Sequence, residues 1–99
     1  MIILVMVPFE MKVQLETQIK LQYQSLVDSF KTIQTQKEIV TLREQALESI
    51  YRSYQQGRIE ISILIDTYSK MVASKVNLTK AYGNFYDKWL SYQSISTQD

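Results

Sequence analysis

The stretch that decides the fold is Tyr54-Gln-Gln-Gly57-Arg-Ile-Glu-Ile-Ser-Ile63-Leu-Ile-Asp66. It separates two long segments that have helical periodicity and, apart from Gly83 in the second, contain neither glycine nor proline. Glycine commonly ends a helix because it adopts the left-handed backbone conformation without strain. Only about three residues follow before the second segment begins, and so short a connection makes the two helices antiparallel neighbours. The stretch therefore predicts the tip of a helical hairpin.

Both flanking segments repeat apolar residues every seven positions, which is the pattern of coiled coils. The rows of the first segment are Ile19, Leu26, Ile33, Val40, Leu47 and Tyr54, and a companion row of Tyr23, Phe30, Lys37, Glu44 and Tyr51 that charge interrupts. The rows of the second are Leu64, Met71, Leu78, Phe85 and Tyr92; Ile61, Tyr68, Lys75, Tyr82 and Trp89; and Ile65, Val72 and Tyr86. Looser packing is expected at the charged positions, and faces this wide predict more than one neighbouring helix.

We therefore predict an all-α fold, a long antiparallel coiled-coil helical hairpin that self-associates into a helical bundle. Residues 1–11 form an apolar leader, either a strand remnant or disordered, and residues 97–99 form a tail. The hairpin takes up 12–96, with one helix at about 12–56, the tip at 57–61 and the second helix at about 62–94. Ser62 is a better chemical candidate than Glu60 for capping the second helix.

Composition narrows the possible functions. The 11 basic and 10 acidic residues are interspersed and give a net charge of +1, without the basic stripe that nucleic-acid binding requires. The chain has no cysteine and no histidine, which removes thiolate ligands and the commonest general base. Its carboxylates are dispersed over both helices and fit solvated helix faces. We expect neither an enzyme nor a cofactor, although carboxylates brought together across helices around a metal would revive an enzyme.

Two further features have alternative interpretations. The aromatic residues near the end of the second helix fit interhelical core better than a stacking platform for a ligand; they are Tyr82, Phe85, Tyr86, Trp89 and Tyr92. The run Met1–Val7 has no preceding basic residue and falls far short of the roughly 20 residues of a membrane span. It predicts neither a signal peptide nor a transmembrane helix.

The tip resembles that of the TolC-like outer membrane efflux proteins. In that family a descending helix finishes with Tyr-x-x-Gly, and the next helix opens with an aliphatic run closed by an aspartate. Tyr54, Gly57, the run 63–65 and Asp66 match these positions without a gap, and the similarity covers roughly residues 15 to 90. Two positions depart from the family pattern. Glu60 stands where the family usually has serine or threonine, and Thr67 stands where it usually has alanine. A complete member has two such hairpins and membrane strands, so the resemblance implies a fragment or a truncated form.

The resemblance implies a non-catalytic hairpin of a periplasmic α-barrel, on the periplasmic side of the bacterial outer membrane. It implies membrane contact only through missing parts of the full-length protein, and docking at the tip to a periplasmic adaptor (membrane fusion) protein. The implied docking residues are Tyr54, Gly57, Arg58 and Ile59, and Asp66 is implied as a carboxylate at the channel entrance.

Simpler interpretations of these residues remain open. Gly57 also fits a plain helix C-cap, and Asp66 fits a first-turn residue favoured by the helix dipole. The alternative function is a generic self-associating coiled-coil module for interaction or scaffolding. In either case a hairpin with such apolar rows is expected to form homo-oligomers.

Overall fold

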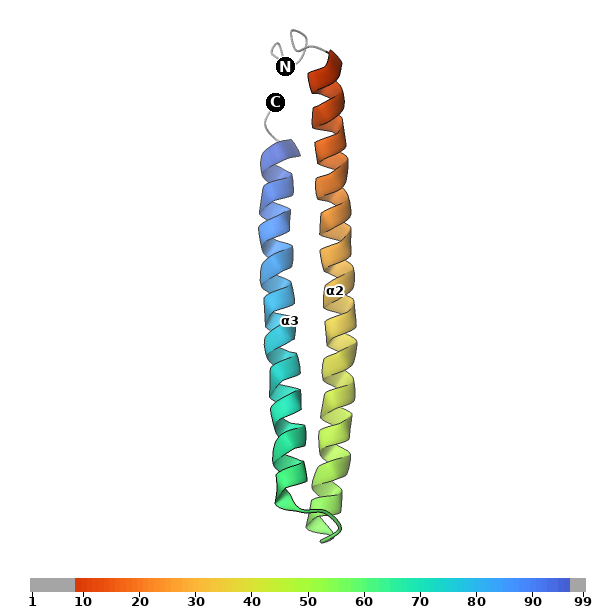
Figure 1. Cartoon of the computed structure of the whole chain (residues 1–99), viewed down its shortest axis with the longest axis vertical. Helices are drawn as coiled ribbons and strands as arrows, with labels where there is room; N and C mark the ends of the chain where they lie inside the picture. Colours follow the sequence, from red (N-terminus) through yellow and green to blue (C-terminus); the bar gives the residue numbers. More distant parts are fainter. Residues whose placement is uncertain (1–8, 97–99) are drawn as a thin grey trace. The chain divides into compact units, whose positions relative to one another are not determined.

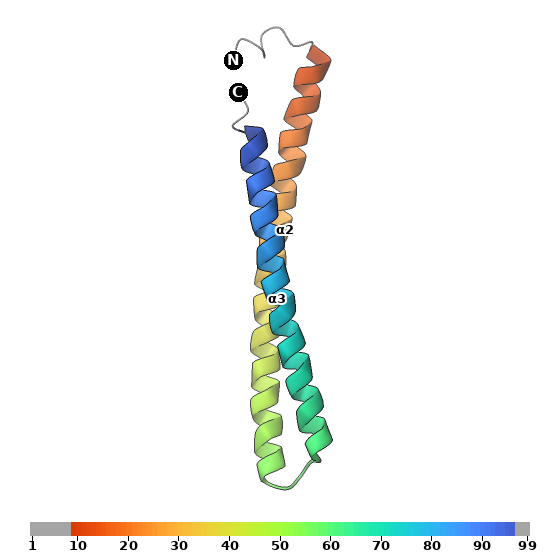
Figure 2. The same ribbon diagram turned by 90° about the vertical axis from the view of Figure 1, so that its left-hand side faces the viewer.

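The computed structural model describes residues 9–96, and within this range the regular structure consists of two α-helices without a strand. Helix α2 spans Phe9–Gln55 and helix α3 spans Ile61–Ser96. Residues 56–60 connect the two helices, which run in opposite directions (Figure 1 and Figure 2). The predicted all-α antiparallel hairpin is confirmed.

Three of the four helix ends lie slightly beyond their predicted bounds, whereas α2 ends at Gln55, one residue before the predicted 56. Helix α2 begins at Phe9, so Phe9–Met11 are helical although we placed them in the leader. Glu10 in the first turn favours this start because a negative charge interacts well with the helix N-terminus. Helix α3 begins one residue before the predicted Ser62 and ends two residues after the predicted Ser94. The remaining leader and tail residues, 1–8 and 97–99, lie outside the described residues.

The chain divides into two compact units. We call residues 32–82 the tip unit, because it contains the connection, and the described residues 9–31 and 83–96 the terminal unit. Each unit pairs a segment of α2 with a segment of α3, and in each the hydrophobic core is a narrow seam between two helices.

In the tip unit the seam follows the predicted seven-residue rows. Ile33, Val40 and Met71 are buried, and Leu47, Leu64 and Leu78 are half-buried. Three of these residues come from each helix, and together they exclude water from the line along which the helices meet. Burial of this apolar area is the main stabilising contribution to the unit.

In the terminal unit Leu26 continues the buried row, and aromatic pairs join the two helices. The ring centroids of Phe30 and Phe85 lie 6.1 Å apart, and those of Tyr23 and Tyr92 lie 6.0 Å apart, both in tilted arrangements. Phe85 and Tyr92 are half-buried, so they belong to the interhelical core as predicted. Tyr82, Tyr86 and Trp89 from the same aromatic group are exposed, so the prediction of interhelical core is wrong for these three.

Small residues also lie in the seam, and the apolar periodicity did not reveal them. Ser29, Ser74 and Ala81 are buried. The Ser74 hydroxyl donates a hydrogen bond to the Met71 carbonyl at 2.7 Å, and Ser29 does the same to Leu26 at 2.8 Å. Each serine therefore satisfies its polar group within its own helix while occupying little space.

Candidate functional site

The tip begins with a Schellman motif that ends α2. Gly57 has a φ of 74°, and its N–H donates to the Tyr54 carbonyl at 2.9 Å. The N–H of Arg58 donates to the Ser53 carbonyl, also at 2.9 Å. This pair of bonds satisfies carbonyls that the last helical turn would otherwise leave without partners. The predicted C-cap role of Gly57 is confirmed.

Gly57 is required for its backbone conformation and not for lack of space. A Cβ built at Gly57 would meet no heavy atom within 4 Å, whereas a positive φ is strained for other residues. Tyr54 and Arg58 are exposed beside it, and Ile59 is half-buried. The structure thus brings four of the predicted site residues together in the last turn of α2 and the connection.

The start of α3 corrects the predicted cap. The Glu60 carbonyl accepts a hydrogen bond from the Ile63 N–H at 3.1 Å, so Glu60 precedes the first helical residue, Ile61. Ser62 lies inside the first turn, where its hydroxyl cannot take the N-cap position. Thr67 donates its hydroxyl to the Ile63 carbonyl at 2.8 Å.

Asp66 lies in the second turn of α3, so its interpretation as a first-turn residue is wrong, and it is apart from the four tip residues along the chain. Its carboxylate forms an ion pair of 3.1 Å with Lys70, one turn further along the same helix. Both side chains are exposed, so the pair adds at most a few tenths of a kcal/mol to helix stability.

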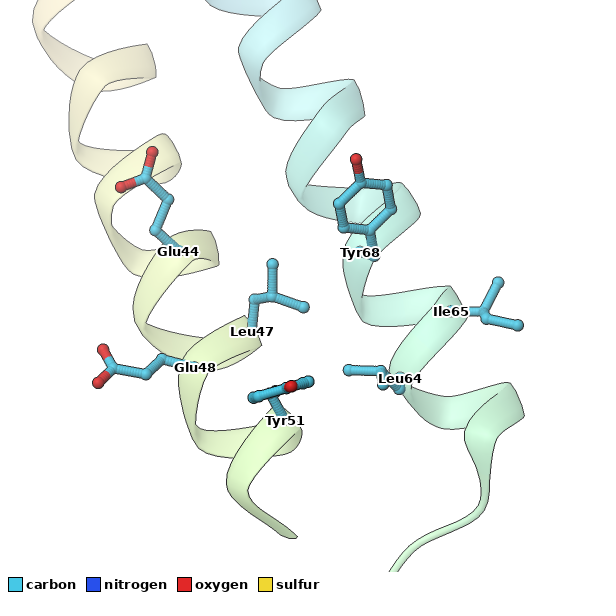
Figure 3. A pocket seen from close by; sticks show the side chains of 7 residues that line it. All are labelled: Glu44, Leu47, Glu48, Tyr51, Leu64, Ile65 and Tyr68. Carbon is cyan, nitrogen blue, oxygen red and sulfur yellow. The ribbon is translucent and has the colours of Figure 1, made fainter. Parts of the chain in front are cut away.

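An apolar groove lies beside the tip, between the two helices of the tip unit. It has a volume of about 560 Å³. Its lining residues are Glu44, Leu47, Glu48, Tyr51, Leu64, Ile65 and Tyr68 (Figure 3). Leu47 and Leu64 come from the seam, whereas Tyr51, Ile65 and Tyr68 are about half exposed. The two carboxylates lie along the α2 side of the groove and have cationic partners, because Glu48 pairs with Arg52 and Glu44 with Lys75.

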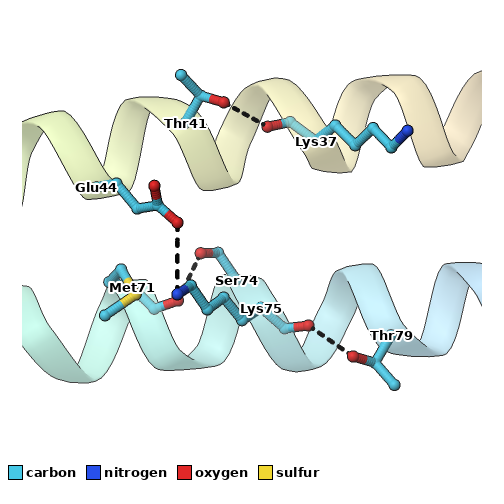
Figure 4. A network of polar contacts seen from close by, with 7 residues as sticks. All are labelled: Lys37, Thr41, Glu44, Met71, Ser74, Lys75 and Thr79. Atoms are coloured by element: carbon cyan, nitrogen blue, oxygen red, sulfur yellow. Dashed lines mark hydrogen bonds and ion pairs between the residues drawn. The ribbon is translucent and has the colours of Figure 1, made fainter.

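Two contacts between the helices follow this groove toward the centre of the tip unit, an ion pair and a cation–π contact, and we call them the rungs. Glu44 forms an ion pair of 3.4 Å with Lys75 on the opposite helix (Figure 4). One heptad further from the tip, the Lys37 ammonium lies 5.8 Å from the ring centroid of Tyr82. The charges that interrupt the companion row of α2 therefore find complementary partners in the matching row of α3. Residue spacing predicted these two rows, but not that their members pair across the helices.

We call the exposed surface on this side of the tip unit the lateral face. It consists of Lys37, Glu44 and Tyr51 from α2, and of Ile65, Tyr68, Val72, Lys75 and Tyr82 from α3. Helical periodicity puts the α3 members on one stripe, beside the residues that pack on α2. The opposite side of α3 carries exposed polar residues, among them Asp66, Lys70 and Asn77.

Within residues 9–96, the structure contains no group of three or more side chains of the metal-binding types that could hold an ion. Neither of the two described helices is long and apolar enough to cross a membrane. Comparisons of the chain with family models, with curated proteins and with solved structures found no match.

Proposed function

We propose that this chain is the periplasmic α-barrel hairpin of a TolC-like outer membrane efflux channel, which docks at its tip to a periplasmic adaptor protein. The observation that carries the proposal is the open tip. Gly57 is exposed at the end of α2, and no atom lies within 4 Å of the place where a side chain would begin. Another backbone can approach such a position closely.

In this proposal each tip residue has a separate task. Gly57 provides the point of close approach, and the adjacent Arg58 guanidinium offers several hydrogen-bond donors to carbonyls or carboxylates of the adaptor. Tyr54 and Ile59 supply apolar contact area beside it. In an assembled channel the copies of Asp66 form a ring of negative charge at the entrance, which favours passage of cations.

The test is site-specific crosslinking from Arg58→Cys to an adaptor encoded beside the gene. The chain has no native cysteine, so a single reactive thiol reports on this position alone. We expect a crosslink between hairpin and adaptor, and we expect Gly57→Trp to abolish it because the indole fills the space that the adaptor backbone needs.

Gly57→Ala is the matched control. Alanine and tryptophan carry the same backbone strain at a φ of 74°, about 1–2 kcal/mol, but the alanine methyl group leaves the approach open. Loss of the crosslink with tryptophan and its retention with alanine supports docking at the tip. Equal loss with both variants would assign the effect to the cap, and no crosslink in a folded hairpin would reject the proposal.

A second candidate function is a self-associating coiled-coil module for interaction or scaffolding. The lateral face favours it, because Tyr51, Ile65 and Tyr68 form an apolar surface that the single hairpin leaves open. Surfaces of this kind mark interaction sites in many proteins. A purified hairpin that associates with itself and fails to crosslink to an adaptor would favour this candidate.

A further inference from the structure

We infer that the lateral face of the tip unit is covered by a second copy of this chain, which packs face to face with its tip at the same end. The inference does not depend on the efflux proposal. It is carried by the extent of exposed apolar surface and by the complementarity between the two flanks of this face.

The exposed apolar area is of the size that often marks an interaction site. Tyr51, Ile65, Tyr68, Val72 and Tyr82 are each 40–58% exposed. At roughly 100 Å² from each side chain, they present on the order of 500 Å² of apolar surface per copy. The stems and heads of Lys37, Glu44 and Lys75 enlarge the contact toward the about 800 Å² per partner of a standard stable interface.

The two flanks of the face complement each other level by level. On the α2 flank the order toward the tip is Lys37, Glu44, Tyr51, and on the α3 flank at the same levels it is Tyr82, Lys75, Tyr68. The first two levels show a cation over a ring at 5.8 Å and an ion pair at 3.4 Å. At the third level both tyrosines line the apolar groove.

If the two copies are related by a two-fold axis parallel to the helices, each α2 flank faces the complementary α3 flank of the other copy. This axis lays the α3 flank of the second copy over the α2 flank of the first, at the same levels. Glu44 then lies between its own Lys75 and the Lys75 of the second copy, and Lys37 lies between two Tyr82 rings. The α2 and α3 segments that meet across the axis run antiparallel, as they do within one chain. The reverse orientation, centred between the two rungs, would set Lys37 against Glu44 of the second copy, but it would place the two apolar grooves at opposite ends of the contact. Only the arrangement with both tips at the same end lays groove against groove.

In the same arrangement, side chains of the second copy fill the apolar groove beside the tip. Tyr68 and Ile65 of the second copy project toward the groove formed by Leu47, Tyr51 and Leu64 of the first. Burying aromatic and aliphatic side chains in this groove supplies the central apolar contact of the interface, and the rungs farther from the tip set its register.

The experiment compares matched variants of the full chain by sedimentation equilibrium over a range of concentrations. The unmodified chain should dimerise, and Tyr68→Glu should weaken dimerisation at least tenfold because it buries a carboxylate in the apolar groove. Asn77→Glu adds the same charge on the opposite side of α3, where Asn77 is exposed, and should leave the dissociation constant within about twofold. Circular dichroism checks that both variants keep the helicity of the unmodified chain.

Orientation is tested by disulfide formation between differently tagged single variants. A mixture of Tyr51→Cys and Tyr68→Cys should give a crosslinked heterodimer, whereas a mixture of Lys37→Cys and Glu44→Cys should not. A chain that stays monomeric at every concentration, equal weakening by both glutamate variants, or preferential crosslinking of the 37 and 44 pair would each overturn the inference. The adaptor crosslink at Arg58 is read separately, so failure of one proposal leaves the other standing.

Discussion

The seam of the tip unit and the lateral face beside it both follow seven-residue rows on the same two helices, but charged residues interrupt the rows of the lateral face. In the seam, Ile33 is 4% exposed and Met71 is 8% exposed. On the lateral face, Ile65 is 58% exposed and Tyr68 is 54% exposed. The seam side of α3 also contains the small residues Ser74 and Ala81, whereas the lateral side carries large side chains. Apolar periodicity thus identifies faces that need cover, and small residues identify the face that meets the nearest helix.

The strongest test removes an aliphatic side chain from the seam and one from an exposed position of the same helix. Ile33→Ala in the seam should lower the free energy of unfolding by about 2–4 kcal/mol, because it loses buried area and leaves a cavity. Leu42→Ala, at an exposed position of α2 in the same unit, should change it by less than about 0.5 kcal/mol. Urea denaturation followed by circular dichroism measures both. Similar losses in the two variants would show that the seam is not the main source of stability.

The role of small residues in the seam is tested at Ser74. Ser74→Leu forces a large side chain between the helices and should destabilise the hairpin by about 1–3 kcal/mol, although leucine is the better helix former. Ser74→Ala should cost less than about 1 kcal/mol, because the hydroxyl bonds only to the Met71 carbonyl of its own helix. Thermal unfolding of the two variants gives the comparison. A stabilising leucine would mean that the helices are not closely packed at this position.

The sequence predicted the hairpin, the C-cap at Gly57 and the seam row through Ile33 and Val40, because these depend on local spacing. It did not predict the small-residue part of the seam, since serine carries no hydrophobic signal and is buried only because its hydroxyl bonds to its own helix. The exposure of Tyr68 also escaped prediction. Its row is apolar apart from Lys75, and which row meets α2 depends on tertiary packing. The tip partner likewise cannot be read from one chain.

A smaller difference in stability between the seam and its surroundings is tested by two opposite substitutions on α3, alanine to glycine in the seam and glycine to alanine outside it. Ala81→Gly removes a buried methyl group and a good helix former, and should cost about 1–2 kcal/mol. Gly83→Ala in the exposed part of the same helix should stabilise by about 0.5–1 kcal/mol, since an added Cβ meets no atom within 4 Å. Melting temperatures of the two variants at low protein concentration should therefore move in opposite directions. A destabilising Gly83→Ala would indicate that something approaches this glycine in solution.

The smallest predicted effect concerns the ion pair between Glu44 and Lys75, and it depends on whether the lateral face is covered. Both side chains are about half exposed in the single hairpin, so Glu44→Gln should cost only about 0.2–1 kcal/mol, and less at high salt. When a second copy covers the face, the pair loses water and gains two more charges, so the cost should grow as protein concentration rises through the dissociation constant.

The control is Asp66→Asn, which breaks the pair with Lys70 on the polar side of α3 and should cost the same few tenths of a kcal/mol at every concentration. Denaturation curves of both variants, recorded well below and well above the dissociation constant, make the comparison. A cost at Glu44 that stays as constant as the one at Asp66 would mean that the lateral face remains open to water even when the chain associates.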